Sequence, residues 1–199
     1  MSAPVPGNSN NDSLRAAVRG APRVHLLLWQ DYAEDADHHL QGWLDGHLEQ
    51  IAGHNWREIT VYDYSPGSVF AATPPAGLVL SNADFSGQLR LLGYTERRLA
   101  VGPGLRVALV WRRLAPVTRA FHVFVHLVDR DGHSLANADH RPAFDMLDLR
   151  SWDGGRLLVD PCELAASGGV PDHLELGLYD PADGFRLQPA SLRLPYRPH

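Results

Sequence analysis

The sequence predicts a mainly β protein, an antiparallel β-sandwich of jelly-roll or immunoglobulin-like type that follows a small strand-helix-strand unit. After residue 77, apolar and polar residues alternate in short runs, and turn residues separate these runs roughly every ten positions, as in sandwiches. Before residue 65, an apolar run, a helical pattern and an alternating run follow one another. A proline-rich segment separates the two patterns and indicates a linker.

The chain of 199 residues is therefore expected to have four parts. Residues 1–22 are rich in Pro, Gly, Ser and Asn, and they have too few large apolar side chains to offset the entropy of ordering, which predicts a flexible leader. Residues 23–64 are expected to form the strand-helix-strand unit and residues 65–77 the Pro/Gly linker. Residues 78–196 are expected to form the β-sandwich domain.

The first unit is expected to place one amphipathic helix between two strands. Residues 24–29 are a short apolar run, typical of a strand that is buried on both faces. Asp35 is expected to cap a helix that ends at Gly53, and residues 59–64 alternate as in a second strand. If these strands are parallel neighbours, their crossover should be right-handed. The apolar face of the expected helix contains Leu40, Trp43, Leu44, Leu48 and Ile51.

Seven runs are expected to be the strands of the sandwich. A tight turn at residues 129–132 joins two of them, because Gly132 can adopt a positive φ, and residues 180–184 form a similar turn. Residues 121–128 are apolar on both faces apart from two histidines, which favours a central strand. In the second run Leu105, Val107, Leu109 and Trp111 share one face and should line the core. The runs are 89–94, 105–112, 121–129, 134–139, 157–160, 174–179 and 192–196.

Composition argues against several functions. The formal net charge is −5, lysine is absent and the arginines are dispersed along the chain, so no basic stripe for nucleic acid is expected. Cys162 is the single cysteine, which excludes an intrachain disulfide and leaves the compartment undecided. The first 20 residues lack the apolar core of a signal peptide, and no run reaches the roughly 18 apolar residues of a membrane span. We therefore expect no transmembrane segment.

Several segments resemble a region of known membrane enzymes. They are residues 110–112, 123–129, 131–132, 177–181 and 186–187 with Gly184, and they are similar to the extracytoplasmic C-terminal region of bacterial lipid-phosphate-sugar-dependent, protein-mannosyltransferase-like membrane glycosyltransferases. In that class a segment similar to residues 23–45 often precedes the sandwich. The resemblance implies a β-sandwich on the outer side of the cytoplasmic membrane, although nothing in the sequence would direct the chain there.

The resemblance does not carry over transferase activity, because the catalytic acidic residue and the lipid-sugar site of that class lie in a membrane part that this sequence lacks. It implies a non-catalytic accessory domain of a glycosyltransferase system, whose partner is carbohydrate or a membrane glycosyltransferase. A structural or protein-interaction module without a ligand is the alternative.

A carbohydrate site is expected in the turn-rich segment that contains Trp152. Its ring would supply an apolar surface for sugar C–H groups, and Arg150, Asp153 and Asp139 would bind hydroxyl groups. Trp111 and Tyr179 are further candidates for this aromatic surface, although both lie in expected strands and are more simply core residues.

A structural calcium ion is a further possibility in the same acidic loop. Asp145, Asp148 and Asp160 would be its ligands, together with Asp153, because calcium is bound by oxygen atoms alone. A solvated acidic loop without an ion is the simpler interpretation.

Histidines suggest a third class, a metal-dependent enzyme. His122 and His126 should share one strand face, where His133, His140 or Asp139 would complete a metal site, although hydrogen-bonded core histidines are the simpler interpretation. No His-Glu-x-x-His motif, phosphate-binding loop or nucleophile elbow is present, so no catalytic residue is predicted. The expected helix also carries three histidines, which we interpret as solvated or half-buried: His38, His39 and His47.

Overall fold

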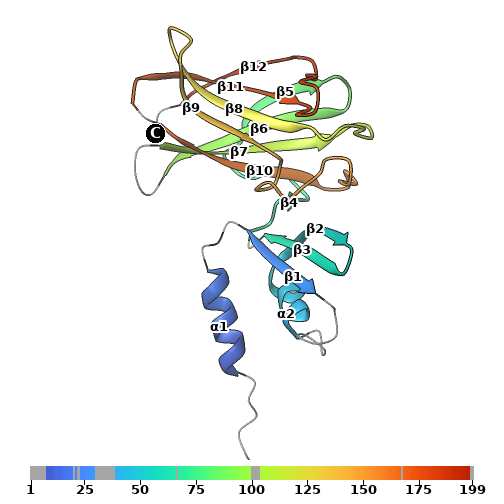
Figure 1. The fold of residues 1–199 in the computed structure, drawn as a ribbon. Coiled ribbons are helices and arrows are strands. Elements are labelled where there is room, and N and C mark those ends of the chain that lie inside the picture. The colour runs from blue at the N-terminus through green and yellow to red at the C-terminus, as the bar shows by residue number, and fades with distance from the viewer. Residues whose placement is uncertain are drawn as a thin grey trace, which may run out of the picture. The chain divides into compact units, whose positions relative to one another are not determined.

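The computed structural model describes residues 8–19, 21, 23–29, 39–65, 67–99, 104–166 and 168–197. The chain divides into two compact units, Met1–Ser68 and Val69–His199 (Figure 1). The mainly β fold with antiparallel sheets is confirmed. Within the described residues, no helix is long and apolar enough to cross a membrane.

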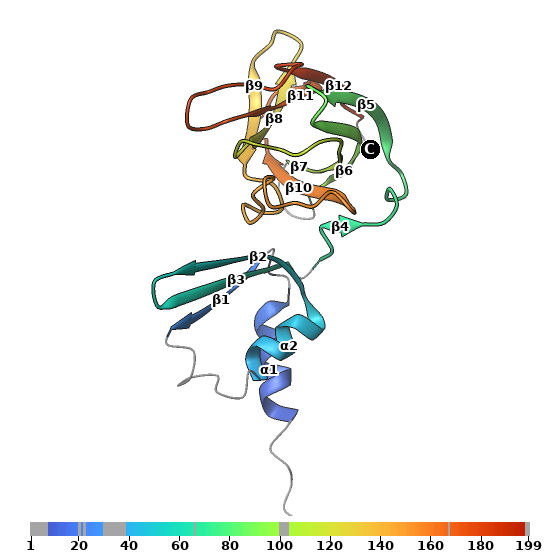
Figure 2. The same ribbon diagram turned by 90° about the vertical axis from the view of Figure 1, so that its right-hand side faces the viewer.

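Unit 1 is a three-stranded antiparallel sheet with helices on one of its faces. Its order is β1-β3-β2, so β3 is central. Buried Leu26 and Leu28 of β1 pack with Trp43 and Leu44 of α2, and Tyr64 of β3 completes the cluster. Figure 2 shows α2 along one side of the sheet. The elements are α1 Asn8–Val18, β1 Val24–Trp29, α2 His39–His47, β2 Glu49–Trp56 and β3 Ile59–Ser65.

One expectation for the helix of this unit is wrong, and the condition set for its crossover is not met. The helix ends at His47 rather than at Gly53, because residues 49–56 instead pair with β3 as strand β2, and this segment contains the weak helix formers Gly53 and Asn55. β1 and β3 pair antiparallel, so the rule for parallel crossovers does not apply. Asp35 and His38, expected at the start of the helix, lie outside the described residues.

The expected leader contains a helix, which the composition of residues 1–22 did not reveal. Within α1, Leu14 and Val18 are four residues apart and so lie on one helix face. Both are partly buried against the apolar cluster of unit 1. Their packing gives a short polar helix an apolar contact that its own propensity would not supply.

Unit 2 is the β-sandwich, built from two antiparallel sheets (Figure 1). One sheet has the order β4-β10-β7-β6-β5 and the other the order β12-β11-β8-β9. The strands are β4 Phe70–Ala71, β5 Val79–Phe85, β6 Leu89–Arg98, β7 Gly104–Arg113, β8 His122–Asp129, β9 Ser134–His140, β10 Leu157–Ala165, β11 Pro171–Tyr179 and β12 Leu192–Pro195.

The seven expected strands are all present in this unit, and β8 lies between β11 and β9 as expected of a central strand. The inward row of β7 is buried along its whole length. Gly132 has the positive φ of 87° that the turn after β8 requires. Strand β5 escaped prediction because its alternation is interrupted at Asn82, which has a φ of 57° beside a register shift.

The expected linker is partly a strand. Residues 70 and 71 form β4, which pairs with Leu157 and Leu158 of β10, and Val69 is buried. The boundary between the units therefore falls at residues 68 and 69, inside the segment predicted as a linker. Two residues of strand are too short for any period to show in the sequence.

Close packing across the second sheet generates a stability prediction. A Cβ atom on Gly177 of β11 would lie 2.6 Å from the Phe124 ring and 2.8 Å from the carbonyl oxygen of Ala190. We expect Gly177→Ala to lower the free energy of unfolding by about 1 to 3 kcal/mol, because the added methyl group must displace its neighbours. Thermal and urea unfolding followed by circular dichroism measures this.

Gly42→Ala is the matched control. Gly42 lies in α2, and a Cβ atom there would meet nothing within 4 Å. We expect this substitution to be neutral or to stabilise unit 1 by up to about 1 kcal/mol, since alanine favours the helix. Equal effects of the two substitutions would contradict the packing described around Gly177.

Candidate functional site

Trp152, the centre of the predicted carbohydrate site, is buried. Only 2% of its surface is exposed, and the neighbouring Met146, Leu147 and Leu149 are buried with it. The segment that looked like an exposed binding loop therefore folds its apolar residues into the core. The prediction that Trp152 presents its ring to a sugar is wrong, because burial of a large aromatic surface is the stronger tendency.

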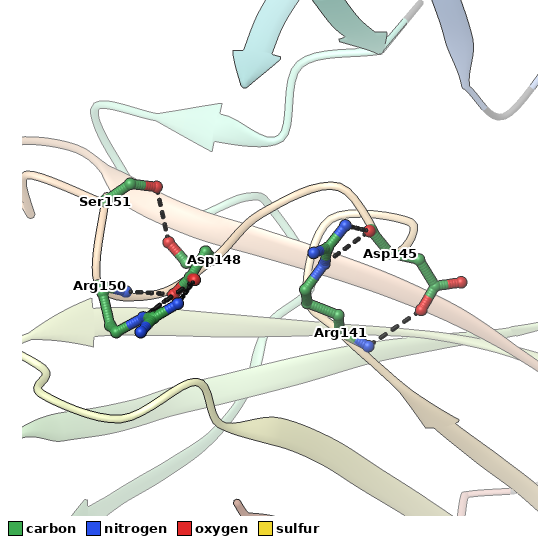
Figure 3. Close-up of polar contacts among 5 residues, drawn as sticks. All are labelled: Arg141, Asp145, Asp148, Arg150 and Ser151. Carbon is green, nitrogen blue, oxygen red and sulfur yellow. Dashed lines mark hydrogen bonds and ion pairs between the residues drawn. The ribbon is translucent and has the colours of Figure 1, made fainter. Parts of the chain in front are cut away.

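The polar residues predicted around Trp152 do not form a common site with it. Arg150 is exposed and forms an ion pair with Asp148, with 3.0 Å between Nε and each carboxylate oxygen (Figure 3). Asp153 accepts a hydrogen bond from the backbone N–H of Gly155 at 2.8 Å, which shapes a turn. Asp139 lies on strand β9, where its carboxylate takes part in a different cluster.

The proposed calcium ligands are also held apart in separate interactions. Asp148 pairs with Arg150, and Asp145 accepts a hydrogen bond from the backbone N–H of Arg141 at 3.0 Å (Figure 3). Asp160 is buried in the core. Among the described residues, the carboxylates of Asp145, Asp148 and Asp160, which the sequence predicted as calcium ligands, do not form a group close enough to share one metal ion.

Among the described residues, one group has side chains close enough to hold a metal ion: Asp129, Asp131 and His133 in the turn after β8. One oxygen of Asp129 accepts the backbone N–H groups of residues 131 and 133 at 2.9 and 2.8 Å. These bonds lower the pKa of Asp129, the contact with His133 being the largest cause. They account for the position of this carboxylate as part of a tight turn.

A buried histidine and a buried aspartate link the two sheets of the sandwich. Asp160 belongs to the inward row of β10, and none of its surface is exposed. His140 of β9 places Nε2 3.1 and 3.2 Å from the two carboxylate oxygens of Asp160. The backbone N–H of Ala143 donates a further hydrogen bond of 2.8 Å to the same carboxylate. The buried charge is thus satisfied from the facing sheet and from the following loop.

His140 is positively charged in this arrangement. Its Nδ1 lies 3.1 Å from the carbonyl oxygen of Ala138, and its Nε2 faces Asp160, so both nitrogens have acceptors and both must carry hydrogen. Burial alone would lower the pKa of His140, but the charge and hydrogen bonds of Asp160 outweigh burial and raise this pKa to about 9. The pair is a salt bridge inside the core, not a metal site.

The outer face of the β12-β11-β8-β9 sheet carries the most developed group of aromatic and polar side chains in the described part of unit 2. Alternation along β8 turns Val123, Val125 and Leu127 inward, so the intervening side chains point outward. Tyr179 of β11 and Asp139 of β9 are the direct strand partners of His122 and Phe124. We call the following residues the outer-sheet cluster: His122, Phe124, His126, Asp139, Tyr179 and Arg186.

Contacts within the outer-sheet cluster hold its side chains in place. Nε2 of His126 lies 3.0 Å from the Asp139 carboxylate. Tyr179 packs edge-on against His122, with 5.8 Å between the ring centroids. The guanidinium carbon of Arg186 lies 4.9 Å above the Phe124 ring. The rigid sheet thus presents rings, one carboxylate and one guanidinium group together.

In the outer-sheet cluster, the local electrostatics favour the uncharged forms of Tyr179 and His122 beside the charged Asp139 and Arg186. Burial is the main cause that raises the pKa of Tyr179, and Asp139 raises it further. Burial also lowers the pKa of His122, and the positive charge of Arg141 adds to this effect. At neutral pH the tyrosine hydroxyl therefore keeps its hydrogen, and His122 is uncharged.

Sequence reasoning found parts of this cluster separately. His122 and His126 do share one face, as expected, but the structure does not bring them together as metal ligands: one packs on Tyr179 and the other bonds Asp139. Phe124 and Arg186 were missed as site residues. The period-two alternation of residues 121–128 already placed Phe124 beside the histidines. Arg186 reaches the sheet only through the loop after β11, which has no such periodicity.

The other histidines have local partners or are solvated. His47 stacks on Trp43 with 4.4 Å between ring centroids, and its Nδ1 lies 2.8 Å from the Trp43 carbonyl oxygen. His39 is exposed. Their arrangement agrees with a solvated or half-buried helix face.

The His140–Asp160 salt bridge makes unfolding depend on pH in a predictable direction. The pKa of His140 rises from 6.5 to about 9 on folding, so its contribution to stability is complete below pH 6.5 and is lost as the pH rises through 9. We expect this loss to be about 3 kcal/mol between those limits. Urea unfolding measured across this pH range tests it.

Two variants separate this effect from general alkaline destabilisation. The double substitution His140→Leu, Asp160→Leu should flatten the pH dependence, because it removes both charges from the core. His133→Gln should keep the dependence of the original protein, since His133 is exposed and pairs only with Asp129 at the turn. A pH profile unchanged by the double substitution would show that the pair does not carry the effect.

Comparison of the chain with protein-family models, with curated proteins and with solved structures finds no match. The described geometry distinguishes the two candidate sites of unit 2. That geometry favours the outer-sheet cluster over the loop around Trp152.

Proposed function

We propose that this chain is a non-catalytic accessory module of a glycosyltransferase system and that its β-sandwich binds carbohydrate through the outer-sheet cluster. The observation that carries the proposal is the combination of partly exposed rings with a carboxylate and a guanidinium group on one sheet face. Asp139, one of the residues predicted from sequence to bind hydroxyl groups, lies at its centre.

The chemistry of this face suits a sugar ring. Tyr179 and His122 are partly exposed and offer apolar ring surface for sugar C–H groups, whereas Phe124 is buried and supports them from below. Asp139 is exposed enough to accept hydrogen bonds from hydroxyl groups, and Arg186 can donate them. Because these groups are fixed by their own contacts, little side-chain entropy is lost when a ligand binds.

The link to glycosyltransferases comes from the sequence resemblance. Two of the resembling segments, residues 123–129 and 177–181, supply Phe124, His126 and Tyr179 of the outer-sheet cluster. The proposed ligand site therefore falls within the part of the chain that carries the resemblance. A non-catalytic role agrees with the state of Cys162, a buried thiol whose pKa burial raises strongly, which makes it a poor nucleophile.

A glycan-array screen of the purified protein tests the proposal, followed by calorimetric titration with any glycan that binds. We expect Asp139→Ala and Tyr179→Ala each to weaken binding about 10- to 100-fold, because the first removes the carboxylate that accepts from sugar hydroxyl groups and the second removes the ring surface that packs on the sugar. Circular dichroism should show that the fold is retained.

Asp153→Ala is the matched control, since it removes another exposed carboxylate at the position predicted from sequence. It should leave glycan affinity unchanged. Binding that persists in both cluster variants would place the site elsewhere. If no glycan binds the folded protein, the alternative of a structural or protein-interaction module without a ligand is favoured.

A further inference from the structure

Two members of the outer-sheet cluster, Tyr179 and Arg186, lie at the two ends of one turn. Tyr179 is the last residue of β11, and Arg186 forms an isolated antiparallel bridge with it across residues 180–185. The backbone N–H of Leu187 donates to the carbonyl oxygen of Leu178 at 3.1 Å, which continues this pairing by one residue. The conformation of the turn therefore determines where the Arg186 guanidinium group lies relative to the Tyr179 ring.

Hydrogen bonds within residues 180–185 give this turn its shape. The N–H of Asp180 donates to the carbonyl oxygen of Phe185, and the N–H of Gly184 donates to the carbonyl oxygen of Asp180, both at 2.8 Å. Oδ1 of Asp180 accepts the N–H of Ala182 at 3.0 Å. Oδ1 of Asp183 accepts the N–H of Phe185, also at 3.0 Å. The second oxygen of each carboxylate, Oδ2, is thus left for a donor from outside the turn.

Arg119 supplies that donor from the loop between β7 and β8. Its Nη1 donates to Oδ2 of Asp180 at 3.1 Å and to Oδ2 of Asp183 at 2.7 Å. Its guanidinium carbon lies 4.6 Å from the centre of the Phe185 ring, so the same side chain also packs on the residue immediately before Arg186. One cation from a different loop therefore contacts three residues of the turn.

The charges explain why the turn depends on Arg119. Asp180 is buried, so loss of Arg119 would remove a charged hydrogen-bond donor from a carboxylate that water reaches poorly. The hydrogen bond with Asp183 is the largest cause that raises the pKa of Arg119, and the same bond lowers the pKa of Asp183. Without the guanidinium group, two carboxylates of one turn would repel each other, which would favour other conformations of the turn.

Arg186 has weaker contacts of its own. It is exposed and, among the described residues, makes no ion pair with a carboxylate. Its guanidinium carbon lies 4.9 Å above the Phe124 ring, and stacking of this kind at an exposed site is a weak contact. The place of the Arg186 guanidinium group therefore depends on the backbone that carries it, which is the end of the turn that Arg119 holds.

We propose that Arg119 is a positioning residue of the carbohydrate site, which holds the turn of residues 180–185 so that Tyr179 and Arg186 meet a ligand in fixed places. This inference rests on the proposed function, since it assigns Arg119 a role at the same site. Arg119 acts through the turn and does not touch the ligand. Because the turn is ordered before binding, less conformational entropy is lost when a sugar binds.

Nuclear magnetic resonance of the full chain without ligand tests the positioning itself. The side-chain signals of Arg186 should be shifted upfield by the Phe124 ring, and their absence from the spectrum of Arg186→Lys identifies them. We expect Arg119→Gln to move these signals toward those of an unstacked arginine. It should also speed hydrogen exchange at the N–H groups of Asp180 and Gly184 about tenfold or more, because the turn opens more often.

The glycan array, probed at a series of protein concentrations, tests the consequence for binding. We expect Arg119→Gln to weaken binding to the glycans that the unsubstituted protein binds by about 3- to 10-fold. In a protein that already carries Arg186→Gln, the same substitution should have a much smaller effect, because Arg119 acts through Arg186. Arg119→Lys should keep most of the affinity, since one nitrogen makes both hydrogen bonds and an ammonium group can replace it.

Arg106→Gln is the matched control. Arg106 lies on the other sheet, forms an ion pair of 2.9 Å with Glu163 and has a similar exposure to Arg119. Its substitution should change neither the Arg186 signals nor binding to the array. Circular dichroism verifies that each variant is folded. If Arg119→Gln does not fold, Asp183→Asn takes its place, because it weakens the same contact at an exposed residue.

The outcomes separate this inference from the proposed function. If the unsubstituted protein binds no glycan, the proposed function fails, and the role of Arg119 at that site fails with it. If glycan binds but a folded Arg119→Gln variant keeps the full affinity or the original Arg186 signals, the inference alone is overturned. It is also overturned if Arg119→Gln weakens binding equally with and without Arg186→Gln, since Arg119 would then not act through Arg186.

Discussion

The salt bridge between His140 and Asp160 is the interaction on which the sandwich of unit 2 depends most. It joins β9 of one sheet to β10 of the other inside the core. A buried carboxylate without its partner would be strongly destabilising, so the two sheets and the loop that donates the Ala143 N–H must keep their relative positions. The following loop then returns Met146, Leu147 and Trp152 to the core.

This constraint explains why the candidate ligand site is a sheet face and not a loop. The apolar side chains of the segment after β9 pack into the core, and its exposed charged side chains form pairs with one another, such as Arg150 with Asp148. On the second sheet, the inward-facing side chains of β8 and β11 already make the core contacts. The outward-facing side chains of this sheet are therefore not needed for core packing. Side chains on that face can gather around Asp139 without disturbing the core.

The two units differ in how the apolar faces of their sheets are covered. In unit 2 each sheet covers the inner face of the other, so the exposed faces are mostly polar or hydrogen-bonded. In unit 1 the helices cover one face of a single sheet, and the second face keeps Leu27, Trp29 and Trp56 in contact with solvent. The apolar run of residues 24–29 is therefore not buried on both faces as its sequence predicts.

Local pattern by itself determined the fold class, the seven main strands of the sandwich, the inward row of β7 and the turn at Gly132, because alternation and turn chemistry depend on near neighbours. Tertiary structure alone decided that residues 49–56 are a strand, that Trp152 is buried, and that Asp160 pairs with His140. It also decided that Arg186 meets Phe124 across the sheet face. These outcomes depend on partners far away in sequence. The local pattern of apolar and polar residues contains no information about the burial or charge of such partners.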